Sequence, residues 1–315
     1  MKTKLSIVRP FALALLALQL PATALAIDWS KVTGTDVTVF YPGQSSWEWI
    51  LTKSDHDGAS DIRKGKTCFD CHEGEEKEIG SKIVSGEKLE PNPIAGKRAA
   101  FDVNVKAAHD DENLYVRLAW PAADTSVAEK EDPQNEAKAT VFIADKSMVA
   151  FDRGGCWSAC HDDLIGMPSD QGKKLTKYLA DSRTKITRQG GDESYKSDAE
   201  LAKLLEQGTF LEFWQARLNK GSASPVEGYV LEKFHESEPP AISVQGGLEN
   251  GEWVVVFSRK LKAGGAGQRS IPSGTVIPIG IAIHDDYAKG RRHNVSFKRT
   301  LALDGGDADI VAGKQ

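Results

Sequence analysis

All four cysteines of this 315-residue chain fall into two short units that end in histidine. The first unit, residues 68–72, reads CFDCH. Two thiols at this spacing add across the two vinyl groups of one haem, and the imidazole that follows reaches the iron. A zinc site would need a second pair of ligands, and a redox dithiol has no use for the histidine. The spacing therefore predicts haem c bound covalently by Cys68 and Cys71, with His72 as the proximal ligand.

The second unit, residues 156–161, reads CWSACH and is one residue longer. The longer spacing leaves two interpretations open. One is a disulfide between Cys156 and Cys160, which an oxidising compartment would permit. The other is a second haem c on the same two cysteines, and the adjacent His161 favours it because a disulfide gains nothing from a following histidine. We therefore expect two covalent haems, with His161 as the second proximal ligand.

The start of the chain, residues 1–26, has the pattern of a secretory signal peptide. Three basic residues among the first nine precede an apolar run at residues 11–20, and residues 24–26 read ALA, a small-x-small cleavage site. The apolar run is too short to span a bilayer, and no later run approaches the length of a transmembrane helix. The pattern predicts a periplasmic protein with no stable membrane insertion.

The charge balance limits the kinds of partner. The chain has a formal net charge of -5, and removal of the basic leader makes it more negative. Such a balance argues against nucleic acid as a partner, because the phosphate backbone carries the same sign. It suits docking to redox proteins, a donor and an acceptor, whose own cofactors lie behind a basic rim.

The pattern of apolar residues changes at residue 101. Residues 27–100 carry the first unit, residues 101–303 show the alternation and turn signals of a β-sandwich, and residues 304–315 form a tail. We expect a mainly β fold in which the second unit belongs to the sandwich. The expected strands are residues 36–40, 101–107, 114–120, 139–144, 147–151, 242–245, 251–257, 275–284 and 295–303.

A helical insertion is expected within the sandwich, at about residues 171–220. Its first helix covers residues 173–188, where apolar residues recur at helical spacing. A capping box of Ser197 and Glu200 starts the second helix. The apolar residues of this second helix continue to Trp214, so we expect the helix to reach that residue.

Each iron needs a sixth ligand, which histidine or methionine supplies in proteins of this kind. His56 lies twelve residues before the first unit, in a polar loop with a glycine that can fold back. Met148 lies before the second unit, although methionine on an alternating strand is more often core filler. His109 sits at a hairpin tip, and His284 and His293 flank the last turn. For each histidine, a hydrated surface position is the alternative interpretation.

Seven stretches of the strand-rich part recur together in one known family. They are residues 105–111, 114–120, 155–161, 251–253, 259–261, 281–286 and 293–296. Together they resemble the ethylbenzene dehydrogenase type haem-binding domain over roughly residues 101–303. That family includes the haem subunits of molybdenum hydroxylating enzymes and of dimethylsulfide or selenate enzymes, and c-type cytochromes with a CxxxCH loop. The resemblance implies a β-sandwich with haem held at one end.

The resemblance also bears on the ligands of the second haem. In the b-type subunits of the family a methionine and a lysine hold the iron; His293 resembles the lysine position, and Met148 lies near the region of the methionine. His161 is expected to take the proximal role, because its own loop tethers it to the haem. The b-type subunits lack a CxxCH segment, so the resemblance implies nothing about the first haem. The distal candidates, in falling order, are His56, His293, Met148, His109 and His284.

These features predict a dihaem c-type cytochrome that transfers single electrons between respiratory redox partners and has no catalytic residues. Two other classes stay open. One is a haem-bearing electron-transfer subunit of a periplasmic molybdenum oxidoreductase. The other is a haem enzyme with an open iron site, against which the surplus of histidines weighs, since it allows both irons to be six-coordinate.

Overall fold

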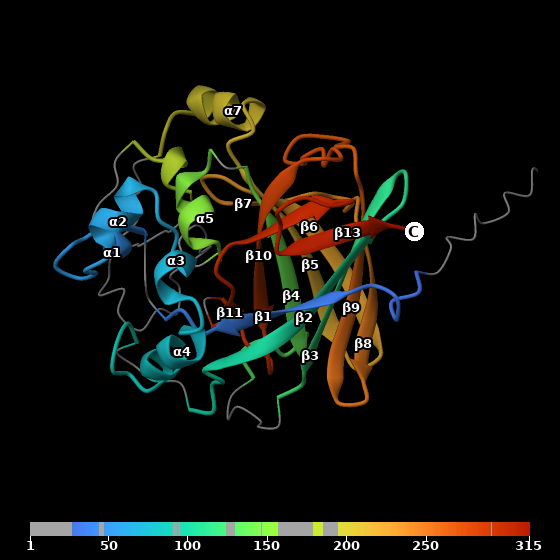
Figure 1. The fold of residues 1–315 in the computed structure, drawn as a ribbon, viewed down its shortest axis with the longest axis horizontal. Helices are drawn as coiled ribbons and strands as arrows, with labels where there is room; N and C mark the ends of the chain where they lie inside the picture. Colours follow the sequence, from blue (N-terminus) through green and yellow to red (C-terminus); the bar gives the residue numbers. More distant parts are fainter. Residues whose placement is uncertain are drawn as a thin grey trace, which may run out of the picture.

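Strands are the main secondary structure of the protein (Figure 1). The structure is a computed structural model and describes residues 27–43, 47–90, 93, 95–123, 130–145, 147–156, 179–184, 195–290 and 292–315. The strands are β1 (Gly34–Phe40), β2 (Ala100–His109), β3 (Asn113–Pro121), β4 (Ala137–Ile143), β5 (Leu211–Asn219), β6 (Ser222–Val230), β7 (Phe234–Glu236), β8 (Ser243–Glu249), β9 (Glu252–Lys260), β10 (Val276–His284), β11 (Asn294–Val295), β12 (Arg299–Leu303) and β13 (Ile310–Lys314). The helices are α1 (Trp47–Ile50), α2 (Ala59–Lys64), α3 (Phe69–His72), α4 (Glu76–Val84), α5 (Val149–Gly154), the 3-10 turn η1 (Ala180–Ser182) and α7 (Asp198–Glu206).

The strands form one hydrogen-bonded sheet that folds over on itself. Its order is β7-β6-β5-β4-β10-β11-β1-β2-β3-β9-β8, and β12 and β13 make a second connection from β10 to β2. β6, near one end of this order, packs against β8, at the other end. The two halves of the sheet therefore enclose a common core, as Figure 1 shows. The prediction of a mainly β fold with a sandwich architecture is confirmed.

Alternation along the strands builds this core. On β2, Val103, Val105 and Ala107 are buried, while the residues between them are exposed or half-buried. β4 differs, because every one of its residues is buried. Val141 and Ile143 face the core between the two halves of the sheet and Phe142 faces a second apolar cluster, so both faces of this strand are covered. Burial of each large apolar side chain contributes about 2 kcal/mol, and Trp120 and Trp214 are fully buried.

The predicted hairpin is formed by β2 and β3, and Asp110 organises its turn. The carboxylate of Asp110 accepts hydrogen bonds from the backbone N–H groups of Glu112 (2.7 Å) and Asn113 (2.6 Å) and from the Tyr115 hydroxyl (2.7 Å). Partial burial alone would raise the pKa of Asp110, but these hydrogen bonds outweigh it and hold the pKa at about 2, below the usual 3.8.

Replacement of Asp110 by alanine is expected to lower the free energy of unfolding by about 1 kcal/mol at neutral pH, because the turn loses its acceptors at a site that solvent screens. The carboxylate pKa is depressed in the folded protein, so its contribution is complete above pH 3.8 and is lost as the pH falls toward 2. Unfolding measured across that range should therefore show a steeper loss of stability for the wild type than for Asp110→Ala. Parallel curves for the two proteins would contradict the assignment.

One expected strand is a helix. Residues 147–151 were expected to be extended, but Val149–Gly154 form α5. A short apolar run fits either period, and the buried residues here are Ala150, Phe151 and Gly154, which share one helical face. Gly155 ends the helix and leads directly to Cys156. The segment before the second cysteine unit is therefore a helix end and not a strand end.

The second predicted helix is shorter than expected. Its capping box of Ser197 and Glu200 is present, but α7 ends at Glu206. Gly208 follows with a φ of 80°, and the chain then forms β5, which includes Trp214. The apolar residues from Leu211 onward alternate along this strand and were misread as a helical face. Most of the predicted first helix, residues 173–188, lies outside the described residues.

Besides β5, three strands were not predicted, and one was predicted too long. β6 and β7 follow β5 directly, and β13 lies in the expected tail. The expected strand at residues 295–303 divides into β11 and β12. Ser296 lies at the break, and its hydroxyl accepts a hydrogen bond from the Ile281 N–H (2.9 Å) in place of a strand partner. A side-chain hydrogen bond that replaces a backbone hydrogen bond of the sheet leaves no periodic pattern of apolar residues in the sequence.

The N-terminal segment shares the sheet instead of forming a separate body. β1 pairs with β2 along its whole length and with β11 at Phe40. α4 packs on β1 and β2 at very short range, since a Cβ atom on Gly80 would lie 2.2 Å from the Ala99 carbonyl oxygen. Helices α1 to α4 therefore cover one end of the sandwich, beside α5 (Figure 1).

Candidate functional site

A cavity of about 770 Å³ opens among the helices of the N-terminal segment. Its wall includes the three residues of the first unit that are predicted to bind haem, Cys68, Cys71 and His72, and also His56. The volume is in the range of sites for large cofactors. The structure thus brings together the residues predicted for the first haem. The apolar part of the wall is made by Trp49, Ile50, Ile62, Ile79, Ile83 and Leu89.

Local hydrogen bonds shape the loop of the first unit. Thr67 and Asp70 cap each other, because the Thr67 N–H donates to the Asp70 carboxylate (2.7 Å) and the Asp70 N–H donates to the Thr67 hydroxyl (3.1 Å). This reciprocal cap starts the single turn of α3. The guanidinium of Arg299 lies 4.1 Å from the ring centre of Phe69 and pairs with the buried Glu76 at 3.5 Å. The loop is thereby held between β12 and α4.

Two imidazoles face each other across this cavity. The ring centres of His56 and His72 are 6.3 Å apart, with 37° between their planes. Two imidazoles that share one metal ion at bond lengths of about 2 Å have ring centres roughly 6 Å apart. Nδ1 of His56 lies 2.9 Å from the Ile50 carbonyl oxygen, and Nδ1 of His72 lies 2.8 Å from a Glu75 carboxylate oxygen. In both rings Nε2 is therefore the nitrogen left for a metal, as is usual for histidine ligands whose other nitrogen is anchored.

Three cysteines of the described residues are free thiols, namely Cys68, Cys71 and Cys156. Burial raises the pKa of Cys68 to about 12, and the neighbouring Cys71 adds to the shift; burial alone raises the pKa of Cys156 to about 12. The thiols of Cys68 and Cys156 are therefore protonated at neutral pH. Within the described part of the chain, no cluster of three or more His, Cys, Asp or Glu side chains suited to a metal ion is present.

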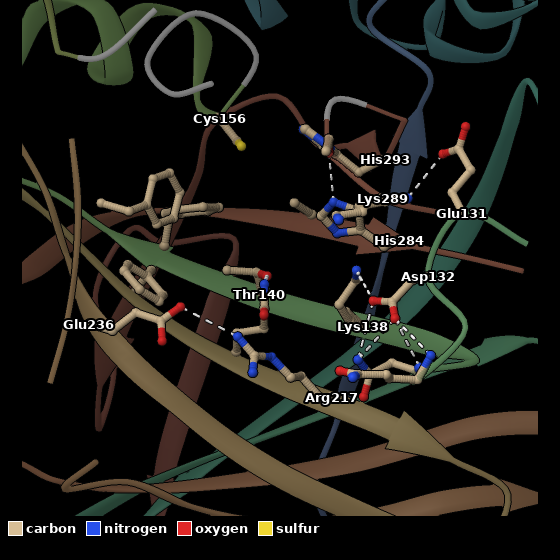
Figure 2. A pocket seen from close by; sticks show the side chains of 18 of the residues that line it. Glu131, Asp132, Lys138, Thr140, Cys156, Arg217, Glu236, His284, Lys289 and His293 are labelled. Carbon is tan, nitrogen blue, oxygen red and sulfur yellow. Dashed lines mark hydrogen bonds and ion pairs between the residues drawn. The ribbon is translucent and has the colours of Figure 1, made fainter. Parts of the chain in front are cut away.

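A second cavity of about 520 Å³ lies in the sandwich and contains Cys156 (Figure 2). His284 and His293 line it too, together with the apolar side chains of Phe142, Phe213, Phe234 and Ala282. Figure 2 shows the Cys156 sulfur and His293 at one end of the cavity, and His284, Lys138 and Arg217 follow one another across the neighbouring strands β10, β4 and β5. All of its walls come from residues 131–293, whereas the walls of the first cavity come from residues 49–89.

The two histidines of the second cavity share one anchor. His284 Nε2 and His293 Nδ1 lie 2.8 and 3.0 Å from the same Gly290 carbonyl oxygen. Their ring centres are 4.9 Å apart, closer than the roughly 6 Å of two imidazoles on opposite sides of one metal ion. They are therefore not an opposed ligand pair like that of the first cavity, and a tethered proximal ligand is still required. Burial lowers the pKa of His284 well below 6.5, and repulsion from His293 adds to this, which keeps the ring neutral as metal ligation requires.

His284 also has an unsatisfied polar atom. Its Nδ1 is buried and has no hydrogen-bond partner among the described residues. A buried polar nitrogen of this kind costs about 1–3 kcal/mol unless a ligand or water meets it. The second cavity therefore fits a group that brings a metal or a hydrogen-bond partner to its histidine end.

The remaining predicted ligands lie elsewhere. His109 is buried at the far end of β2, where its Nε2 is 2.8 Å from Asp304 and its Nδ1 is 2.9 Å from the Asp110 carbonyl oxygen. Met148 is buried at the start of α5, and its sulfur lies 3.6 Å from the Arg269 guanidinium. Neither residue lines one of the two cavities. Cys160 and His161 lie outside the described residues.

The loop of the first cysteine unit contacts α5, the helix that leads to the second unit, which the sequence did not suggest. The Cys68 N–H donates to the Arg153 carbonyl oxygen (2.9 Å), and the Arg153 guanidinium donates to the Gly65 carbonyl. The Phe297 ring is nearly parallel to that of His72, with ring centres 6.4 Å apart. Arg153 and Phe297 were missed because their partners are distant in sequence. A loop of the first site therefore rests on the helix that leads to Cys156.

Gly155 permits close packing of the end of α5 against the backbone of Phe297 and Lys298, and replacement of Gly155 by alanine tests this packing. Its φ of 66° disfavours a side chain, and a Cβ atom would lie 2.5 Å from the Lys298 nitrogen and 2.8 Å from the Phe297 carbonyl carbon, which are backbone atoms. We expect Gly155→Ala to lower the free energy of unfolding by about 2–3 kcal/mol and to reduce the haem attached at the adjacent Cys156. Gly274→Ala is the matched control, because Gly274 has a φ of 75° but open space around it. Equal melting temperatures and haem contents for the two variants would contradict the contact.

No helix in the described part of the chain is long and apolar enough to cross a membrane.

Comparison with known proteins gives relatives over nearly the whole chain. Cytochrome c-552 of Stutzerimonas stutzeri is 39% identical over 294 residues, which are 93% of this chain and 92% of that protein. Cytochrome c-551 of Rhodocyclus tenuis is 33% identical over 292 residues, which are 92% of this chain and 100% of that protein.

The matches among solved structures are more distant. A family 9 carbohydrate binding module from Caldicellulosiruptor kristjanssonii in complex with cellotriose is 11% identical, with a TM-score of 0.29, and the match covers 62% of this chain and 64% of the module. A carbohydrate-binding protein of Bacteroides uniformis is 7% identical, with a TM-score of 0.31 over 68% and 78% of the two chains. Scores this low support no argument about fold or function.

The family assignment comes from a sequence model of the ethylbenzene dehydrogenase family. It matches residues 26–238. The match begins before the first cysteine unit, so it includes the segment for which the resemblance at residues 101–303 gave no guidance. It covers more than half of the chain, and the two relatives extend over nearly all of it. The chain belongs to the ethylbenzene dehydrogenase family.

Proposed function

We propose that the protein is a periplasmic dihaem c-type cytochrome that passes single electrons between redox partner proteins. The observation that carries the proposal is the opposed pair of His56 and His72, 6.3 Å apart between ring centres, beside the two thiols of a CxxCH unit. Two relatives that cover nearly the whole chain are named cytochrome c-552 and cytochrome c-551, which supports the same class.

The first haem would be held by residues of the segment 27–100. Cys68 and Cys71 would form the thioether bonds, His72 would be the proximal ligand and His56 the distal one. Both imidazoles have an anchored Nδ1, so their orientation is set before the iron arrives. Trp49 and Ile50 would exclude water from one side of the porphyrin.

The second haem would lie in the sandwich at residues 101–303. Cys156 and Cys160 would attach it, and His161 would be its proximal ligand. His293 is the preferred distal ligand, because its Nδ1 is held by the Gly290 carbonyl while the Nε2 of His284 already lies against the same oxygen. Lys138 and Arg217, which line the same cavity and pair there with Asp132 and Glu236, would supply positive charge for the haem propionates.

Haem iron would supply one-electron chemistry by cycling between the ferrous and the ferric state. With His56 and His72 on one iron and His161 and His293 on the other, both irons would be six-coordinate, which would leave no open position for a substrate and favours a carrier over an enzyme. The negative net charge favours docking to donor and acceptor proteins with basic rims. Export rests on the leader pattern of residues 1–26, which lie outside the described residues.

The test is the haem content of protein purified from the periplasm. The intact mass and the pyridine haemochrome spectrum should give two covalent haems per chain, and the reduced protein should not bind carbon monoxide promptly. One haem per chain would reassign Cys156 and Cys160 to a disulfide. Prompt carbon monoxide binding would favour an open iron site and an enzyme. A colourless protein would overturn the proposal.

A further inference from the structure

The two imidazoles of the first cavity have anchors of different charge. His56 Nδ1 faces a neutral backbone carbonyl, that of Ile50, at 2.9 Å. His72 Nδ1 faces a carboxylate, that of Glu75, at 2.8 Å. The sequence presented Glu75 only as one member of a charged run at residues 73–78. His72 and Glu75 are the two ends of a tight turn in which Gly74 has a φ of 79°, and this turn brings their side chains together.

The backbone around Glu75 fixes this contact. The Glu75 N–H donates to the His72 carbonyl oxygen (3.1 Å), and the next residue, Glu76, is buried against Arg299. Glu75 also immediately precedes α4, which packs on β1 and β2. The carboxylate is therefore held beside the ring by its neighbours, even though its side chain is half exposed to solvent (53%).

A carboxylate in this position affects the metal through the ring. A hydrogen bond from Nδ1–H to a carboxylate raises the basicity of the coordinating Nε2 and places negative charge near the iron. Both effects stabilise the ferric more than the ferrous state, and second-shell hydrogen bonding is one of the established controls of haem potential. A neutral carbonyl, such as the one that anchors His56, has a weaker effect.

We propose that Glu75 is a positioning residue that lowers the reduction potential of the first haem through its hydrogen bond to His72. The inference rests on the proposed function, because it requires iron at His72. It concerns the potential of the first haem alone.

The experiment is a redox titration of the haem-loaded Glu75→Gln variant. Glutamine keeps the length and an acceptor oxygen but removes the charge, so one of the two midpoint potentials should move to a more positive value while the other stays in place. Glu78→Gln is the matched control: Glu78 lines the same cavity and loses the same charge, but its partner is Lys82 at 2.6 Å. Its potentials should move less than those of Glu75→Gln.

The outcomes separate this inference from the proposed function. Two haems with potentials that do not respond to Glu75→Gln, or that respond equally to Glu78→Gln, would overturn the role of Glu75 and leave the dihaem cytochrome intact. A chain without covalent haem at Cys68 and Cys71 would overturn both. An unchanged haem count and circular dichroism spectrum in Glu75→Gln would show that any shift in potential is not a consequence of misfolding.

Discussion

A chain with both Cys68→Ala and Cys71→Ala is expected to carry one covalent haem instead of two. Both thiols line the first cavity, and no other cysteine of the described residues does so. His72 and His56 alone would bind a haem only through exchangeable iron bonds, which acid acetone breaks. The intact mass should therefore fall by one haem beyond the change in the two side chains, and the pyridine haemochrome absorbance per chain should halve.

Asp70→Asn is the matched control for the double cysteine variant. Asp70 lies between the two cysteines and caps α3 with Thr67, but it has no atom that can form a thioether. This variant should keep both haems. If the Cys68→Ala, Cys71→Ala chain still carried two covalent haems, the first cavity would not be the attachment site. The corresponding change of Cys156 and Cys160 should remove the other haem and, combined with the first pair of changes, leave a colourless chain.

Arg259→Leu is expected to lower the free energy of unfolding by about 3–5 kcal/mol, because it leaves a buried carboxylate without its cation. Arg259 on β9 is 3% exposed, and Glu212 on β5 is fully buried. The guanidinium donates to both carboxylate oxygens, at 2.8 and 3.0 Å, and Glu212 also accepts from the Trp214 indole (2.8 Å) and the Arg269 N–H (2.6 Å). Burial raises the pKa of Glu212, and the charge of Arg259 opposes that shift. The loss is measured by denaturant unfolding of the haem-loaded protein.

Lys260→Met controls for the loss of a positive charge on the same strand. Lys260 is the next residue of β9 and pairs with Glu112 at 2.5 Å, but both side chains are largely exposed. Its replacement should change the free energy of unfolding by less than about 1 kcal/mol, because water screens the pair. Adding Glu212→Gln to Arg259→Leu should recover part of the loss, since the unpaired charge is then gone. Similar losses for Arg259→Leu and Lys260→Met would contradict the importance of the buried pair.

Local features of the chain were predicted well. The alternation at residues 101–107 and 114–120 predicted the β2–β3 hairpin, and the capping box at Ser197 predicted the start of α7. These features depend on neighbours in sequence, whose periodicity reports their own environment. The short apolar run before Cys156 was misread, because helix and strand periods cannot be distinguished over five residues.

The candidate site was predicted in its chemistry but only partly in its geometry. Cysteine spacing identified the CxxCH unit, and the order of candidates placed His56 first; the structure sets it opposite His72. The same reasoning ranked His109 and Met148 among the ligands, although both lie outside the two cavities. A histidine in a loop has the same appearance in a sequence whether it faces a cofactor or an aspartate such as Asp304.

By itself, the sequence determined which thiols lie close enough to bind one porphyrin, which faces of the strands are buried and where the chain turns, because each of these depends on residues within a few positions of one another. Only the tertiary structure decided which histidine stands across from His72, that Glu75 holds its ring and that the loop of Cys68 rests on Arg153. The contact of Glu75 with His72 is local in sequence and that of Cys68 with Arg153 is distant. All three contacts nevertheless depend on directions of side chains and backbone groups that a one-dimensional pattern does not encode. Packing of the helices against the sheet sets those directions.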